Sequence, residues 1–336
     1  SGRRSGLADE LGEVVTTLGR VAEAWMAKPE DARAAQARLG AEFLALWSST
    51  LLRLQGQDAA PVVSPDPRDK RFADPKWSSN AAFDFIKQAY LVSTRWADAM
   101  VRDAEGVDPH TRDKAAFYLK QISAALSPTN FLPTNPELIR ETWREKGENL
   151  VRGMSMLAQD IEAGRGELRL RQSDPSKFKV GENIAVTPGA VVFRNDLIEL
   201  IQYTPATEQV LRRPLLIVPP WINKYYILDL NPEKSFIRWA VEQGLTVFCI
   251  SWVNPDARQA AKGFDAYMHE GVLAALDAVG RITGERQAAT IGYCVGGTLL
   301  AVTLAYLAAR EDDRVASATF FTTQVDFQHA GDLKVF

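Results

Sequence analysis

The chain has 336 residues, which is enough for one large domain or two ordinary domains. Its 46% hydrophobic and 24% charged residues are typical of a globular protein, and a net charge of −3 gives no electrostatic reason to expect nucleic-acid binding. No apolar stretch is long enough to span a membrane, and two cysteines with three scattered histidines predict neither a disulfide framework nor a metal site. The scarcity of cysteine favours a reducing, cytoplasmic location.

The first half of the chain has helical periodicity. Apolar residues recur at spacings of three and four from Leu7 to Trp25, and further helical patterns cover residues 42–54, 81–102, 112–126 and 136–162. Residues 56–80 are rich in Pro, Asp and Ser and predict a linker or a long surface segment. We expect a helical N-terminal domain over residues 1–170.

The second half alternates between strands and helices. Early strands are expected at residues 179–187, 190–194 and 196–203, and short apolar runs predict buried strands at 214–219, 245–252, 288–293 and 315–322. Helices are expected between the later strands, at residues 232–243, 264–283 and 297–309. This alternation predicts an α/β domain over residues 171–336, with two or three antiparallel strands followed by four parallel ones.

Cys294 lies at the apex of a bend between an apolar strand and an apolar helix. The sequence Gly-Tyr-Cys-Val-Gly-Gly, residues 292–297, matches the Gly-x-nucleophile-x-Gly pattern of a nucleophile elbow. Such a turn lifts the sulfur to the carboxyl edge of the sheet, where open α/β folds bind ligands. The N-terminus of the next helix favours a thiolate, and the Val295 amide is placed to donate to an oxyanion. We therefore predict that Cys294 is a nucleophile.

Three glycines, Gly292, Gly296 and Gly297, surround this bend, where larger side chains would collide with the strand or the helix. The alternative is a glycine-rich connection that holds a buried structural cysteine. A phosphate cradle fits less well, because the spacing matches neither Gly-x-Gly-x-x-Gly nor a P-loop. The position between a strand and a helix favours catalysis for Cys294, whereas Cys249, in the middle of an apolar run, is expected to be part of the core.

The segment after the first parallel strand, residues 219–235, supplies the second oxyanion amide in α/β-hydrolases. Trp221 or Ile222 would be the donor here, and the sequence leaves both open. The alternative is a strand that ends at a proline and continues as an aromatic surface loop.

Segments spread over most of the chain resemble the polyhydroxyalkanoate synthases, specifically class I. The segments that carry the resemblance are DKRFADPKW (69–77), SPTNFLPTNPE (127–137), GENIAVTPGAVVFRN (181–195), PLLIVPPWINKYYILDL (214–230), VFCISWVNPD (247–256), GYCVGGTLLA (292–301) and TTQVDFQHAGDLKVF (322–336). Val295 after the cysteine favours class I over class II. The resemblance implies a helical N-terminal domain followed by an α/β-hydrolase-like catalytic domain.

The resemblance also implies an activity. Cys294 would carry a growing polyester chain as a thioester, with (R)-3-hydroxyacyl-coenzyme A as substrate, short-chain as in 3-hydroxybutyryl-coenzyme A, and with release of coenzyme A. No cofactor is expected, because the coenzyme A thioester is itself a substrate. The protein would act as a homodimer in the cytoplasm at polyester granules. The tryptophan-rich helices of the N-terminal domain would contact the granule surface, a partner or the second protomer.

The expected base and acid are harder to place. In α/β-hydrolases both follow the nucleophile in sequence, and 42 residues follow Cys294 here. Solvated or packed roles are expected for all three histidines, His110, His269 and His329, and the downstream acids lie at a helix end or past the last strand. We therefore expect an incomplete α/β-hydrolase-like sheet, truncated before its acid and base, in a chain that is inactive alone.

Two other functions remain open on the sequence. A cysteine hydrolase of the dienelactone-hydrolase type can have a very similar elbow, but it would lack the helical half and the aromatic segment 219–235. A non-catalytic scaffold that docks on granules would use the amphipathic run from Leu7 to Trp25 and carry a vestigial hydrolase half.

Overall fold

The computed structural model describes residues 7–335, so the parts of the expected domains at residues 1–6 and at Phe336 lie outside the described residues. The chain forms two compact units, and it passes from the first to the second between Leu170 and Arg171. The first unit is helical and the second contains the main sheet. Within the described part of the chain, no helix combines the length and the apolar character needed to cross a bilayer.

The end of the chain departs from the expected division. The second unit is Arg171–His329, and residues 330–335 group with the helical unit. They form a short 3-10 helix, Gly331–Val335, that packs against helix α5 (Pro109–Ala125). Val335 is 3% exposed, and Lys334 pairs with Asp113 at 2.8 Å. A second ion pair joins Asp332 to Lys120 at 3.7 Å. One buried apolar side chain and two ion pairs therefore attach this segment to the helices.

The helical unit contains α1 (Leu7–Met26), α2 (Pro29–Leu54), α3 (Lys76–Ser79), α4 (Ala81–Arg102), α5 (Pro109–Ala125), α6 (Pro136–Arg144) and α7 (Glu148–Ala163). Polar side chains define several helix starts: Asn80 caps α4, Asp108 caps α5 and Asn135 caps α6, each by accepting from backbone amides of the first turn. Helix α2 begins well before the expected residues 42–54, because Pro29 opens a helix that continues without a break.

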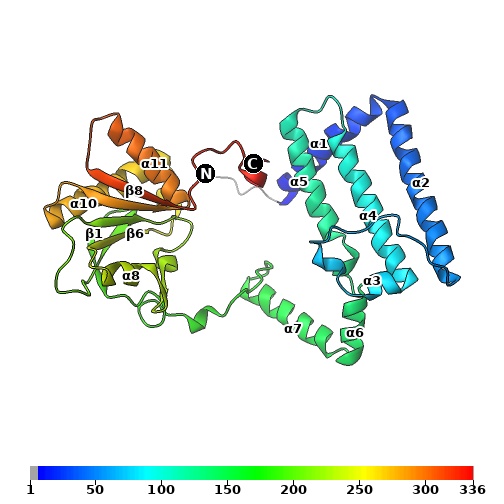
Figure 1. Ribbon diagram of the computed structural model, residues 1–336, viewed down its shortest axis with the longest axis horizontal. Helices are drawn as coiled ribbons and strands as arrows, with labels where there is room; N and C mark the ends of the chain where they lie inside the picture. Colours follow the sequence, from blue (N-terminus) through cyan, green and yellow to red (C-terminus); the bar gives the residue numbers. More distant parts are fainter. Residues whose placement is uncertain (1–6, 336) are drawn as a thin grey trace. The chain divides into compact units, whose positions relative to one another are not determined.

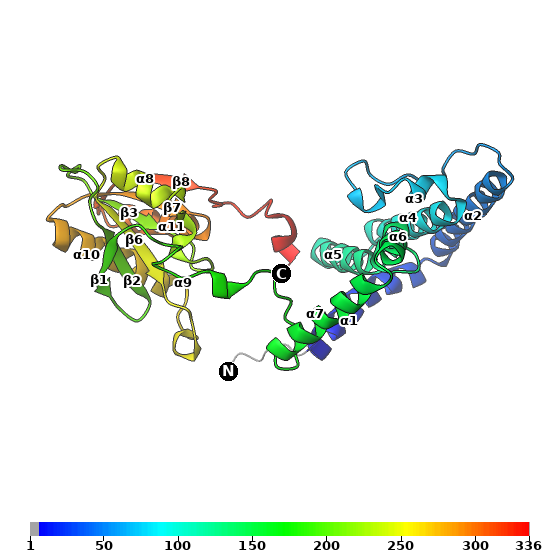
Figure 2. The ribbon, with the colours of Figure 1, turned by 90° about the horizontal axis from the view of Figure 1, so that it is seen from below.

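Helix α4 lies between α2 and α5 in both views (Figure 1 and Figure 2). The carboxylate of Asp84 on this helix is 2% exposed and lies 2.9 Å from both Arg53 on α2 and Lys87. The neighbouring Gln88 accepts hydrogen bonds from the amides of residues 62–63. These contacts show that residues 56–80, expected to be a linker or a surface segment, are bound to the helical unit.

The α/β unit has a main sheet in the order β1-β2-β6-β3-β7-β8. Its elements are β1 (Gly189–Arg194), β2 (Ile198–Tyr203), β3 (Leu215–Val218), β4 (Asp229–Asn231), β5 (Lys234–Ser235), α8 (Phe236–Glu242), β6 (Val247–Trp252), α9 (Phe264–Ala266), a π-helical turn (Tyr267–Leu273), α10 (Ala274–Thr283), β7 (Ala288–Tyr293), α11 (Val295–Ala308) and β8 (Val315–Phe321). Strand β2 is antiparallel to both its neighbours, and β6, β3, β7 and β8 are parallel. The prediction of early antiparallel strands followed by four parallel ones is confirmed.

The strands of the sheet bury both faces. Along β3, Leu216 and Val218 join the core on one face, and Leu215 and Ile217 join the core on the other. The first core contains side chains of α10 and α11 and the second contains side chains of α8. Figure 1 shows α8 on the opposite side of the strands from α10 and α11. Coverage on both sides explains the continuous apolar runs of the sequence.

The prediction of a strand over residues 179–187 is wrong. Only an isolated bridge joins Val180 and Ile184, and the end of the segment turns toward the β4–β5 hairpin. There the buried Asp229 carboxylate accepts a hydrogen bond of 2.7 Å from the Thr187 hydroxyl. The amides of residues 182–184 bond the carbonyl oxygen of Lys179, and those of Ala185 and Thr187 bond Asp229. The segment therefore satisfies its polar groups in a local turn and at the hairpin instead of in the sheet.

Candidate active site

Cys294 occupies the turn between β7 and α11, with backbone angles φ +53° and ψ −125°. A positive φ is uncommon and strained for a residue with a side chain. The thiol is exposed. Because β7 is parallel to both its neighbours, Cys294 follows the carboxyl end of β7, the edge where open α/β sheets bind ligands. The local sequence therefore builds a tight strand-to-helix turn with an accessible sulfur at its apex.

The three glycines of the bend leave no room for a side chain. A Cβ atom at Gly292 would lie 2.5 Å from the Cα of Gly297, and one at Gly296 would lie 2.4 Å from the carbonyl oxygen of Val218. A Cβ atom at Gly297 would lie 1.9 Å from Oγ1 of Thr323. All three distances are below the 3.0 Å that real Cβ contacts respect. The turn can form this way only with glycine at these positions.

The loop after β3 lies beside the bend. A Cβ atom at Gly296 would also meet the carbonyl oxygen of Pro219 at 2.5 Å, so the backbone of this loop touches the first turn of α11. Val295 is the first residue of that helix, and its amide therefore has no acceptor within the helix. Trp221 and Ile222 follow on the same loop. The structure brings the candidate oxyanion donors to one end of the sheet, and the choice between Trp221 and Ile222 stays open.

An aromatic cluster supports this loop. The ring of Trp221 lies 5.0 Å from Tyr267 and 6.1 Å from Trp252, between ring centroids. The Trp252 indole also donates a hydrogen bond of 2.8 Å to the carbonyl oxygen of Pro219. Ile222, in contrast, is 77% exposed. The aromatic contacts anchor the loop at Trp221 and leave its next residue at the surface.

The structure gives Cys294 no base among the described residues of the α/β unit. His269 is exposed and contacts the ring of Tyr306 edge-on at 5.1 Å, and His329 is exposed after the last strand. Of the acids, Asp312 pairs with Arg314. Within residues 171–329, neither a histidine nor a carboxylate hydrogen-bonds the thiol. His110, the third histidine, lies exposed in the first turn of α5 in the helical unit.

Cys249 has the opposite environment. It is fully buried in β6, between Ile201 of β2 and Ile217 of β3. Burial raises the pKa of the Cys249 thiol above its ordinary range, and the nearby Asp229 carboxylate adds to the shift. The prediction that this cysteine belongs to the core is confirmed.

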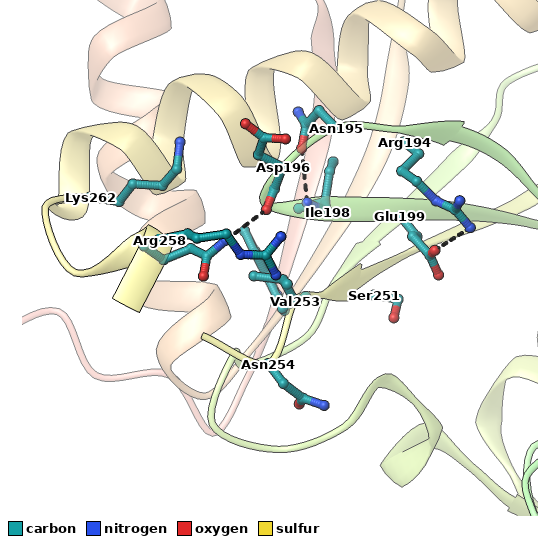
Figure 3. A pocket seen from close by; sticks show the side chains of 12 residues that line it. Arg194, Asn195, Asp196, Ile198, Glu199, Ser251, Val253, Asn254, Arg258 and Lys262 are labelled. Atoms are coloured by element: carbon teal, nitrogen blue, oxygen red, sulfur yellow. Dashed lines mark hydrogen bonds and ion pairs between the residues drawn. The ribbon is translucent and has the colours of Figure 1, made fainter. Parts of the chain in front are cut away.

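A pocket of about 490 Å³ lies at the carboxyl end of β6, next to the β1–β2 turn (Figure 3). No residue of the bend at Cys294 lines it. Its three cationic side chains already have carboxylate partners: Arg194 pairs with Glu199 at 2.5 Å, Arg258 pairs with Asp256 at 2.9 Å, and Lys262 pairs with Glu270. All three cationic side chains of the pocket are therefore engaged in ion pairs within the unit.

Sequence reasoning missed the contribution of residues 321–324, which include the last residue of β8 and the three residues after it, and which contact the bend. Thr323 packs against Gly297, and its hydroxyl lies 3.4 Å from the carbonyl oxygen of Gly292. Thr323 and Gly292 are 31 positions apart in the chain, so no local pattern could have joined them.

The family model and the curated relatives that match this chain point to the same protein family. The family model of the poly-beta-hydroxybutyrate polymerase (PhaC) N-terminus matches residues 68–240. The poly(3-hydroxyalkanoate) polymerase of Methylorubrum extorquens is 63% identical over 329 residues, which cover 98% of this chain and 54% of that protein. The PhaC subunit of the poly(3-hydroxyalkanoate) polymerase of Cupriavidus necator is 42% identical over 301 residues, which cover 90% and 49%. The chain spans about half the length of the curated relatives it matches.

A solved structure of an alpha/beta hydrolase from Novosphingobium aromaticivorans aligns with 39% of this chain and 42% of its own, at 19% identity and a TM-score of 0.25. That overlap is too slight to bear on fold or function, and the fold assignment is carried by the strand order and the strand-to-helix turn. The family match covers residues 68–240, more than half of the chain, and includes parts of both units. The chain therefore belongs to the poly-beta-hydroxybutyrate polymerase (PhaC) N-terminus family.

Proposed function

We propose that this chain is the nucleophile-bearing part of an acyltransferase that builds polyester from (R)-3-hydroxyacyl-coenzyme A, with Cys294 as the residue that carries the acyl chain. The observation that carries the proposal is the strained, exposed position of Cys294 in a turn that only glycine neighbours permit. Relatives named poly(3-hydroxyalkanoate) polymerase support the substrate class. A dienelactone-hydrolase-like enzyme has less support, because the family match extends into the helical unit.

The chemistry is an exchange of thioesters followed by formation of an ester. The Cys294 thiolate attacks the thioester carbonyl, the carbon–sulfur bond to coenzyme A breaks, and coenzyme A leaves as a thiolate that takes up a proton. The exchange of one thioester for another is nearly thermoneutral. The 3-hydroxyl oxygen of another acyl group then attacks a thioester carbonyl, loses its proton to a base, and releases a thiol. The amides of Val295 and of Trp221 or Ile222 would stabilise the oxyanion of each step.

An acyl thioester must be shielded from water until the hydroxyl attacks. The Cys294 thiol is exposed, and no base of the described α/β unit hydrogen-bonds it. We place the base, the acid and the cover over the thiol in the part of the polymerase that the relatives have beyond the matched half. This chain alone is then expected to show no sustained turnover. The full-length polymerase is expected to use a short-chain substrate, 3-hydroxybutyryl-coenzyme A.

The test compares a full-length polymerase that contains this chain with its Cys294→Ala and Cys294→Ser variants. Coenzyme A release from (R)-3-hydroxybutyryl-coenzyme A is followed with a thiol reagent, and the covalent acyl-enzyme is measured by intact mass. Loss of the nucleophile should lower turnover by about a thousandfold or more. A Cys249→Ala variant is the matched control and should remain active. Turnover by Cys294→Ala near the wild-type rate would refute the proposal.

A second candidate function is docking of the helical unit on a polyester granule in the cytoplasm. Trp143 is 81% exposed, and Val151 and Met154 on the following helix are also exposed. Trp77, in contrast, is buried in the core, and the indoles of Trp25 and Trp96 hydrogen-bond backbone oxygens within the unit. The exposed apolar side chains of α6 and α7, together with Trp47 on α2, which is 54% exposed, are therefore the candidates for such a contact.

The docking function is tested with a Trp143→Ala, Met154→Gln double variant and poly(3-hydroxybutyrate) beads. The double variant should lose bead binding, and a variant of an exposed charged residue on the same helices, Glu137→Gln, should retain it. Sedimentation of both variants shows whether the same residues hold a homodimer. Unchanged bead binding by the double variant would exclude α6 and α7 as the granule contact.

A further inference from the structure

Two strained residues flank one hydrogen bond at the active-site turn. Cys294 has φ +53° and Thr322 has φ +44°. Phe321 precedes Thr322, and its carbonyl oxygen accepts a hydrogen bond of 2.9 Å from the Cys294 amide. A positive φ is a clear outlier for a β-branched residue such as threonine, and it persists only where surrounding contacts determine it. The contacts on both sides of Thr322 must therefore account for its strained conformation.

The residue after Thr322 makes the first of these contacts. The hydroxyl of Thr323 lies 3.2 Å from the carbonyl oxygen of Phe321 and 3.4 Å from that of Gly292. The Phe321 oxygen is thus within reach of both the Thr323 hydroxyl and the amide of the catalytic candidate. The same hydroxyl fills the space above Gly297, where an added Cβ would collide with it.

A second contact comes from helix α11. The Thr298 hydroxyl donates a hydrogen bond of 2.7 Å to the carbonyl oxygen of Gln324. Thr298 lies in the first turn of the helix that Cys294 caps. Residues 321–324 are therefore tied to the turn before the cysteine, to the cysteine amide and to the helix after it.

We propose that residues 321–324, here called the clasp, hold Cys294 in its strained conformation and that Thr323 is a positioning residue for this nucleophile. The loop after β3 supports the turn from one side through Gly296, and the clasp supports it from the other. Without the clasp the turn can relax and the sulfur can rotate away from the N-terminus of α11, where a thiolate is stabilised. The inference rests on the proposed role of Cys294.

The test measures alkylation of Cys294 by iodoacetamide in this chain, which does not depend on polymerisation. Thr323→Ala and Thr323→Ser differ only in the hydroxyl, so their comparison isolates its contribution. Thr319→Ala, at an exposed position of β8, the strand that precedes Thr323, is the matched control. Rates are measured by mass spectrometry from pH 7 to pH 9, and protection of the buried Cys249 shows in each sample that the unit is folded.

Thr323→Ala should slow alkylation of Cys294 by about fivefold or more, the effect of losing one neutral hydrogen bond, while Thr323→Ser and Thr319→Ala stay within about twofold of wild type. In a full-length polymerase, Thr323→Ala should lower kcat by a similar factor and leave KM unchanged. A wild-type alkylation rate in Thr323→Ala, or equal rates in the Ala and Ser variants, overturns the proposal.

If Cys249 becomes reactive in Thr323→Ala, that variant has lost its fold, and Thr298→Ala is used for the test instead. Thr298→Ala removes the hydrogen bond between α11 and the clasp. Slower alkylation of Cys294 with Cys249 protected then supports the clasp, and a wild-type rate overturns it. If the turnover of a full-length polymerase does not depend on Cys294, the proposed function is refuted. The alkylation rates still test the clasp in that case, because they do not depend on turnover.

Discussion

The amide nitrogen of Cys294 lies 2.9 Å from the carbonyl oxygen of Phe321, and this hydrogen bond joins the turn after β7 to the end of β8. The two residues are far apart in sequence, yet their strands are parallel neighbours in the sheet. The conformation of the candidate nucleophile thus depends on an adjacent strand as well as on its own glycine-rich motif.

We predict that Gly296→Ala destabilises the α/β unit, because its Cβ would lie 2.4 Å from the Val218 carbonyl oxygen. The cost should be about 1–3 kcal/mol of unfolding free energy, as for other overpacked positions. Gly280→Ala on α10 is the control, since its Cβ would make an ordinary contact of 3.5 Å and should stabilise the helix by about 0.5–1 kcal/mol. Urea unfolding measures both, and equal midpoints for the two variants would contradict the steric argument.

The buried carboxylate of Asp84 should matter far more than an exposed one between the same helices. Asp84→Ala leaves Lys87 buried without its carboxylate partner and should cost about 3–5 kcal/mol of unfolding free energy. Glu42→Ala breaks the exposed pair with Arg95, which also joins α2 to α4, and should cost at most about 1 kcal/mol. Thermal and urea unfolding of both variants test this, and a mild effect of Asp84→Ala would show that the buried cluster is dispensable.

The buried thiol of Cys249 should make stability fall at alkaline pH. Its folded pKa is raised, so above about pH 8.5 only the unfolded chain releases this proton, and the unfolding free energy should fall by about 1.4 kcal/mol per pH unit. Below that pH the thiol is protonated in both states and contributes no slope. Urea midpoints at pH 7.5, 9.0 and 9.8 measure the effect. Cys249→Ala should flatten this dependence, and an unchanged slope in that variant would exclude Cys249 as its source.

The segment 330–335 should be stabilised by its own contacts with α5. Val335→Asp places a charge in a buried position and should release the segment, which raises amide hydrogen exchange in Gly331–Val335 and in the facing part of α5. Lys334→Ala removes only a partly exposed ion pair and should change exchange little. Exchange in β7 and α11 serves as the internal reference. Protection of the segment that survives Val335→Asp would contradict this account.

Several features of the fold could be predicted because their signals are local. The apolar run before Cys294 predicts a strand over residues 288–293, which is where β7 lies. The alternation of apolar runs with helical patterns predicted the parallel part of the sheet. The strand expected at residues 179–187 does not form, because residues 179–184 close a local turn and Thr187 bonds the Asp229 carboxylate, which is distant in sequence.

For this protein, the sequence by itself determined the strand-to-helix turn at Cys294, since small residues at fixed spacing and a change from strand to helix pattern are properties of consecutive residues. The family motifs likewise lie within short segments. Only the tertiary structure decided that Thr323 fills the space above Gly297, that Asp84 joins two helices, and that the last described residues pack on α5. These contacts join residues from distant parts of the chain, and their partners are chosen by packing and by the burial of polar groups, which no local pattern records.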